Sequence, residues 1–164
     1  MIKFLTLGEE KMIKVYVSRF NSETDTEPHL ECYEIEKTPH MKVLDALQAI
    51  NDKYDADISF RSSCRAGQCG SCGILFKGNG ALACQKEIKN GAIIEPLNFP
   101  VIKDLIVDKS SIEAKVKDLE LSLQCDHKCE LDTSITKEDS KETKKVRSCI
   151  ECYSCLSTCP VLKI

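Results

Sequence analysis

The stretch that decides the fold is Ser62-Ser-Cys-Arg-Ala-Gly-Gln-Cys-Gly-Ser-Cys-Gly73, and one more cysteine, Cys84, stands twelve residues after the last cysteine of this stretch. Its three cysteines, Cys64, Cys69 and Cys72, follow the spacing C-x4-C-x2-C. This spacing is typical of a plant-type [2Fe–2S] site. A loop that gives three ligands to one small cluster must wrap tightly, and the glycines beside the cysteines allow this. The sequence therefore predicts a [2Fe–2S] cluster on these four cysteines.

The surroundings of the cysteines bear on which metal they hold. Backbone amides of a glycine-rich loop can point at sulfur and stabilise its negative charge. Ser63, Arg65 and Ser71 are candidate further donors. Zinc is the competing metal, but structural zinc sites usually use paired C-x2-C knuckles. Only Cys69 and Cys72 form such a knuckle here, so the pattern favours iron and sulfide.

Upstream of this loop, the sequence predicts two strands and a helix. Met12 to Phe20 alternates apolar and polar residues, and so does Leu30 to Glu36, which together predict a hairpin. Cys32 lies in the second strand without a ligand-spaced neighbour, and we expect it to be a packed thiol. Residues 43–50 have apolar side chains at helical spacing. A helix laid across one face of a sheet follows from this order of elements.

Downstream of the loop, short strands resume. Gly73 to Phe76 and Ala81 to Cys84 are predicted strands, joined by a Gly- and Asn-rich turn. Ala92 to Glu95 is a further strand, and the prolines of Pro96 to Pro100 punctuate its end. Residues 134–147 are charged and poor in apolar side chains, as a solvated linker is.

Composition excludes several classes of protein. The 164 residues include 23 Lys and Arg against 26 Asp and Glu, and no Trp. A nucleic-acid binder would carry a basic stripe with interleaved aromatic residues, and this chain has none. No apolar run approaches the roughly 20 residues that cross a bilayer, and no export signal is visible. We therefore expect a cytoplasmic protein, in which 11 cysteines serve as metal ligands rather than as disulfides.

A second cysteine group lies near the end of the sequence. Cys149, Cys152, Cys155 and Cys159 form the run C-x2-C-x2-C-x3-C, followed by Pro160. In such a run three cysteines bind one [4Fe–4S] cluster and the fourth binds a different cluster. Each of these two clusters needs further cysteines, which are absent from the sequence after this run. We therefore expect the chain to be truncated, or completed by a segment supplied in trans.

Two strings carry a resemblance to a known family. Residues 63–73 with Leu82-Ala-Cys84 look like the iron–sulfur subunit of succinate dehydrogenase and fumarate reductase, and Phe99 to Asp108 is similar to that family's domain junction. The resemblance extends over residues 12–108 and resumes at Ser148. It implies an α+β fold, in which a β-grasp plant-type ferredoxin domain precedes an incomplete α-helical domain like a bacterial ferredoxin.

The resemblance also implies a division of the chain and a role for each part. We expect a leader over residues 1–11, the [2Fe–2S] domain over 12–108, a connecting helix and linker over 109–145, and a truncated [4Fe–4S] domain over 146–164. The implied activity is electron relay between a flavoprotein (FAD) subunit acting on succinate or fumarate and a distal quinone or thiol partner. Cys159 would help to bind a third cluster, [3Fe–4S] or [4Fe–4S], and a membrane anchor or a thiol-oxidising subunit would complete the complex. Any membrane association, on the cytoplasmic face, would come through such partners.

Some alternatives remain open at this level. Cys125, His127 and Cys129 form a C-x3-C insertion, for which a fourth cluster ligand, a redox pair, an adventitious metal site and surface thiols are all open interpretations. A free-standing [2Fe–2S] ferredoxin is the alternative function, although the terminal cysteine run argues against it. A zinc-stabilised scaffold would be colourless and redox-inactive. The sequence offers no nucleophile, acid–base pair or dinucleotide fingerprint, so catalysis would belong to a partner.

Overall fold

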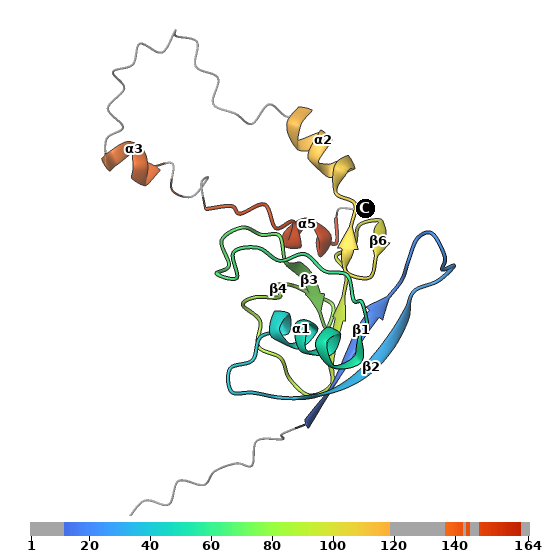
Figure 1. Cartoon of the computed structure of the whole chain (residues 1–164). Helices are drawn as coiled ribbons and strands as arrows, with labels where there is room; N and C mark the ends of the chain where they lie inside the picture. The colour runs from blue at the N-terminus through green and yellow to red at the C-terminus, as the bar shows by residue number, and fades with distance from the viewer. Residues whose placement is uncertain (1–11, 119–136, 143, 145–147, 162–164) are drawn as a thin grey trace, which may run out of the picture.

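The computed structural model describes residues 12–118, 137–142, 144 and 148–161. Its centre is a five-stranded mixed sheet in the order β2-β1-β5-β3-β4 (Figure 1). These strands are β1 (Met12–Arg19), β2 (His29–Glu36), β3 (Gly73–Phe76), β4 (Asn79–Leu82) and β5 (Ala92–Glu95). A two-stranded sheet of β6 (Val101–Lys103) and β7 (Ile106–Val107) follows. The helices are α1 (Val43–Tyr54), α2 (Ser110–Asp118), α3 (Lys137–Glu142) and α5 (Ser154–Ser157).

The predicted hairpin at the start is confirmed, with β1 and β2 paired antiparallel from Met12–Glu36 to Arg19–His29. On its other side β1 pairs in parallel with β5. The expectation for Cys32 is wrong, because this residue is exposed. In β2 the buried positions are Tyr33 and Ile35, and Cys32 lies on the opposite face of a strand at the edge of the sheet.

Helix α1 covers one face of the sheet and closes the main core (Figure 1). Its buried residues recur at helical spacing, as the sequence predicted. The Lys42 backbone N–H donates to the Asp45 carboxylate at 3.0 Å, and the helix ends at Asp55 in a left-handed conformation. The core between the helix and the sheet includes Val15, Ile35, Val43, Leu47, Ile50, Ile74, Phe76 and Ile94. These features confirm the predicted α+β class.

The second strand of the β3–β4 hairpin begins and ends two residues earlier than the predicted Ala81–Cys84. The turn of this hairpin is Lys77-Gly78, with φ 51° and 74°, as a two-residue type I′ turn requires. The second strand spans Asn79–Leu82 rather than extending to Cys84. The Ala83 N–H donates to Cys72 O at 2.9 Å, and the Leu82 carbonyl accepts from two following amides, so the chain turns there. This turn takes Cys84 out of the sheet and toward the cysteine loop.

The opposite face of β3 supports a smaller second core. Leu75 alternates with Ile74 and Phe76, so it faces away from α1. It packs in one cluster with Leu97, Phe99 and Val107, to which residues 148–161, the terminal segment, add Tyr153 and Leu156. The terminal segment therefore lies on the sheet, and α5 contacts β3 and β4 (Figure 1).

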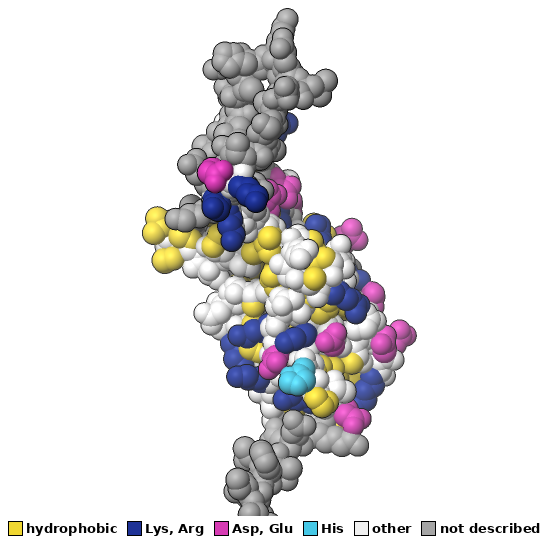
Figure 2. All heavy atoms as spheres, turned by 90° about the vertical axis from the view of Figure 1, so that its left-hand side faces the viewer, with side chains coloured by type: hydrophobic (Ala, Val, Ile, Leu, Met, Phe, Trp, Pro, Cys, Tyr) yellow, Lys and Arg dark blue, Asp and Glu magenta, His cyan; other side chains and the backbone are white. Residues whose placement is uncertain are grey.

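On the face shown in Figure 2, basic and acidic side chains are interspersed with apolar ones. No helix within the described ranges is long and apolar enough to cross a membrane.

Candidate iron–sulfur cluster sites

The first cysteine loop lies between α1 and β3 and has no regular secondary structure. Arg65, Gly67 and Gly70 adopt positive φ angles of 54°, 71° and 67°. Such left-handed residues reverse the chain direction over short distances, and glycine adopts them without a steric penalty. The loop therefore curls back on itself, as the spacing of its cysteines predicted.

The curled backbone directs amides at the first cysteine. Cys64 Sγ accepts hydrogen bonds from the backbone N–H groups of Ala66, Gln68 and Cys69, at 3.4, 3.3 and 3.3 Å. Three donors on one sulfur stabilise a thiolate and any further negative charge that a bound cluster places there.

Cys69 is exposed and has a polar neighbour. Its Sγ lies 3.0 Å from Ser71 Oγ. Hydrogen bonds with Ser71, and then with Cys64, lower the pKa of the Cys69 thiol to about 6. Since the thiolate is the form that binds metals, this residue is prepared to act as a ligand at neutral pH.

Cys72 and Cys84 form the inner pair, with only 5% and 6% of each residue exposed. Burial raises the pKa of Cys72, and the neighbouring Cys84 also influences this pKa. Gln85 Nε2 donates to Cys84 Sγ at 3.6 Å, and its side chain lies beneath Gly67. The turn after β4 thus brings the separate fourth cysteine to the loop, as the sequence predicted.

The four thiols are arranged as an outer pair, Cys64 with Cys69, and an inner pair, Cys72 with Cys84. Within the described residues, no three Cys, His, Asp or Glu side chains surround one point as ligands of a single metal ion would. A [2Fe–2S] cluster needs two thiolates on each of two irons, so two pairs of thiols fit it.

The polar donors were predicted only in part. Ser71 contacts a cysteine sulfur, whereas among the described hydrogen bonds Ser63 and Arg65 make no such contact. Gln85 was missed, although its position directly after Cys84 was a usable signal. Cys125, His127 and Cys129 lie outside the described residues.

The second cysteine set surrounds the short helix α5. Cys149 and Cys155 are exposed, and Cys152 and Cys159 are half-buried. Glu151 and Tyr153 have φ angles of 53° and 59°, so the chain curls before the helix begins. Exposed and half-buried cysteines therefore alternate along this set.

An open hollow of about 450 Å³ lies between the hairpin of β3 and β4 and the segment that carries the second cysteine set. Cys152 and Ser154 line it from the terminal segment, and Gln85, the hydrogen-bond partner of Cys84, lines it from the other side. The Ser154 hydroxyl is buried and has no hydrogen-bond partner among the described residues. The fold thus places the second cysteine set beside the first.

Comparisons with known proteins agree with this arrangement. A family model described as "2Fe-2S iron-sulfur cluster binding domain" matches residues 14–114. The fumarate reductase iron–sulfur subunit of Haemophilus influenzae is 36% identical over 172 residues, covering 94% of this chain and 67% of that protein. This chain belongs to the family of succinate dehydrogenase and fumarate reductase iron–sulfur subunits.

Two further comparisons extend the picture of this iron–sulfur subunit. A chain of the Mycobacterium smegmatis Sdh1 complex in its apo form superposes with a TM-score of 0.80 at 28% identity, covering 92% of this chain and 64% of that one. One of the subunits of the fumarate reductase (CoM/CoB) of Methanothermobacter marburgensis is 55% identical over 152 residues. That alignment covers 93% of this chain and 31% of the relative, so this chain spans about a third of that relative's length.

Proposed function

We propose that this chain carries single electrons within a fumarate reductase or succinate dehydrogenase complex, between a flavoprotein subunit and a distal partner. The observation that carries the proposal is that Cys84 joins three cysteines of one curled loop to make two thiol pairs. Three amides donate to Cys64 Sγ, and the second cysteine set lies against the loop at Gly70 and Gly73. The [2Fe–2S] ligands are Cys64, Cys69, Cys72 and Cys84. Bound clusters supply one-electron oxidation and reduction, and the protein supplies their position and electrostatic surroundings.

The asymmetry of the first site supports a role in relay. The inner pair, Cys72 and Cys84, is buried against the core, while the outer pair, Cys64 and Cys69, is exposed. Amide donors and solvent at the outer pair favour added negative charge, so an electron is better stabilised there. The loop thereby offers a face at which a partner can exchange electrons.

The second set extends the relay. Cys149, Cys152 and Cys155 are the proposed ligands of a [4Fe–4S] cluster, with a fourth ligand from elsewhere, and Cys159 is the proposed ligand of a third cluster. The position of this set on the sheet argues against a free-standing [2Fe–2S] ferredoxin, in which the terminal segment would have no task.

Of the two distal partners, we favour a thiol over a quinone. The relative whose name pairs fumarate reductase with CoM/CoB is 55% identical to this chain, compared with 36% for the Haemophilus influenzae protein. Joining two thiols as a disulfide releases two electrons and two protons. Reducing fumarate to succinate takes up two of each, so the two half-reactions balance when two electrons pass singly.

The test is anaerobic purification with iron and sulfide analysis and EPR of the dithionite-reduced protein. We expect Cys84→Ala to lose the EPR signal of the [2Fe–2S] cluster and, with it, about two irons per chain. Cys149→Ala should keep that signal and lose any further iron. Cys32→Ala is the matched control. Cys32 is exposed on β2 and is not a proposed ligand, so this variant should keep all of its iron. Iron-free wild type, or equal losses in the Cys32 and Cys84 variants, would sink the proposal.

A binding experiment addresses the partner. The wild-type chain, loaded with its clusters, should retain a flavin-containing subunit from the same source on an affinity column, and the retained protein should carry FAD. A chain that reduces a soluble acceptor but retains no flavoprotein would instead support the ferredoxin alternative.

A further inference from the structure

The backbone of the ferredoxin domain touches the terminal segment at glycines. A Cβ atom added to Gly73 would lie 2.9 Å from Cys152 O, and one added to Gly80 would lie 2.8 Å from Ser154 Cβ. At Gly70 it would collide with Ile150 O. Any side chain at these positions would push the terminal segment away.

Backbone conformation does not explain all of these glycines. Gly70 has φ 67°, which by itself favours glycine. Gly73 and Gly80 do not have positive φ angles, so alanine would be conformationally acceptable at both. The contact with the terminal segment is therefore the reason for glycine at Gly73 and Gly80.

Asn98 holds the far end of the same segment. Its backbone N–H donates to Ser157 Oγ at 2.8 Å, and its side-chain Nδ2 donates to the Ser157 carbonyl at 2.7 Å. Ser157 is 5% exposed and ends α5, where a carbonyl lacks a partner within the helix. Asn98 therefore provides the hydrogen-bond donor for the buried Ser157 carbonyl.

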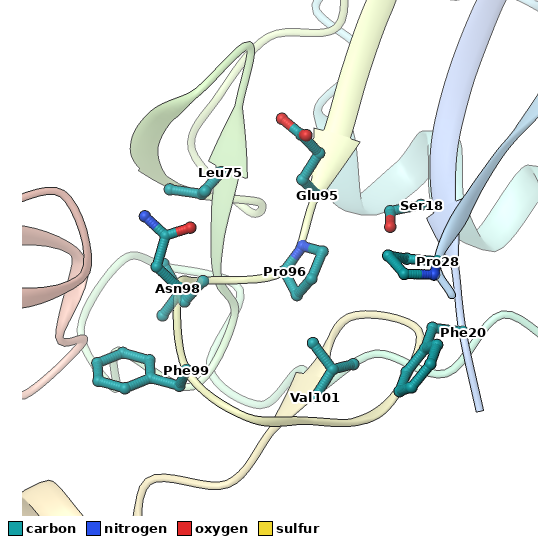
Figure 3. Close-up of a pocket in the computed structure, with 10 residues that line it drawn as sticks. Ser18, Phe20, Pro28, Leu75, Glu95, Pro96, Asn98, Phe99 and Val101 are labelled. Atoms are coloured by element: carbon teal, nitrogen blue, oxygen red, sulfur yellow. The ribbon is translucent and has the colours of Figure 1, made fainter. Parts of the chain in front are cut away.

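Asn98 lies next to an apolar contact between Phe99 and the terminal segment. Figure 3 shows Asn98 and Phe99 on the side of a pocket of about 240 Å³ that faces the terminal segment. The rings of Phe99 and Tyr153 meet edge to face, with centroids 6.4 Å apart. The Lys109 ammonium lies 5.0 Å from the centre of the Tyr153 ring. The two hydrogen bonds from Asn98 to Ser157 thus fix the position of α5 in a contact that is otherwise apolar.

We propose that Asn98 is a positioning residue which, with Gly73 and Gly80, holds the terminal cysteine segment in backbone contact with the first cluster loop. This rests on the proposed function. Gly73 directly follows the ligand Cys72, and its neighbour across the contact is Cys152. The two cysteine sets are therefore joined through two touching backbones. Electron transfer slows steeply with distance, so a contact that excludes a side chain keeps the relay short.

Hydrogen exchange of the full-length chain, followed by mass spectrometry, tests the docking. We expect Asn98→Ala to speed exchange in the peptide over residues 148–161 roughly threefold to tenfold, as the loss of one hydrogen bond does. Gly80→Ala should act in the same direction. Lys77→Ala is the matched control, because Lys77 is exposed in the turn of the same hairpin and alanine, like lysine, is an L-residue at its φ of 51°. Peptides covering β1 and α1 report whether each variant is folded.

EPR measures the magnetic interaction between the two clusters, which a purely structural role of Asn98 would leave unchanged. In preparations with both clusters, Asn98→Ala should weaken the magnetic interaction between them while the iron content stays at the wild-type value. Unchanged exchange over 148–161 in both test variants, or an equal increase in Lys77→Ala, would overturn the inference. Iron-free wild-type protein would count against the proposed function alone, since the exchange comparison still decides the docking.

Discussion

Asp104 is the residue whose loss should most damage the scaffold behind the first cluster loop. It is 2% exposed, and its carboxylate accepts from Arg19 Nε at 2.9 Å, from the Ser59 N–H at 2.8 Å and from the Phe20 N–H at 3.3 Å. Burial by itself would lower the pKa of Arg19, but the hydrogen bond and charge of Asp104 outweigh it and raise that pKa. Ser59 leads into the cysteine loop, so this carboxylate anchors the loop to β1.

The change Asp104→Asn keeps the shape of the side chain and tolerates the observed φ of 47°. It removes the charge and places an NH2 donor against other donors. Breaking a buried pair by removing one partner costs about 3 to 5 kcal/mol. Arg19 also donates to Glu31 and Tyr33, which points to the lower end of this range. At roughly 4 °C per kcal/mol, the unfolding midpoint should fall by at least about 10 °C.

The assay is thermal unfolding of the cluster-loaded chain at one heating rate, followed by far-UV circular dichroism and by the visible absorption of the cluster. Asp57→Asn is the matched control, since Asp57 has φ 48° but pairs with Lys103 on the surface, where its side chain is 83% exposed. Exposed pairs contribute little, so its midpoint should stay near that of wild type. If both variants shift the midpoint equally, the anchoring role assigned to Asp104 is refuted.

Three other changes test separate parts of the molecule. Ser71→Ala removes the hydroxyl 3.0 Å from Cys69 Sγ, and redox titration should give a potential lower by roughly 20 to 60 mV, because that hydrogen bond stabilises the reduced cluster. Lys109→Met removes a cation from the Tyr153 ring, at a cost of about 0.5 to 1 kcal/mol, so hydrogen exchange over residues 148–161 should rise by roughly twofold to fivefold. Asp108 has its pKa lowered by the amide that it accepts from at the start of α2. The contribution of ionised Asp108 to stability is therefore present above the ordinary carboxyl pKa and is lost as pH falls through the lowered pKa. The thermal unfolding midpoints of wild type and Asp108→Ala should converge in acid.

The order of the elements could be predicted from local patterns. Alternation predicted β1 and β2, helical spacing predicted α1, and their physical basis is that each pattern buries one face. The same rule failed for Cys32, because alternation does not say which of its two faces meets the core. The strand predicted over Ala81–Cys84 was placed two residues too late, because the turn needs only Lys77 and Gly78 and because the Leu82 carbonyl accepts from the Gln85 and Lys86 amides, where the chain turns.

The sequence by itself determined the chemistry of this protein: the spacing of the cysteines and the glycines between them specify a loop that can wrap a cluster. Tertiary structure alone decided how the thiols divide into a buried and an exposed pair. It also decided that Asn98 meets Ser157, 59 positions away. The spacing of ligands is a local property, because it depends only on residues that are close in the sequence. Burial and docking depend on contacts between distant segments, which exist only once the sheet has formed.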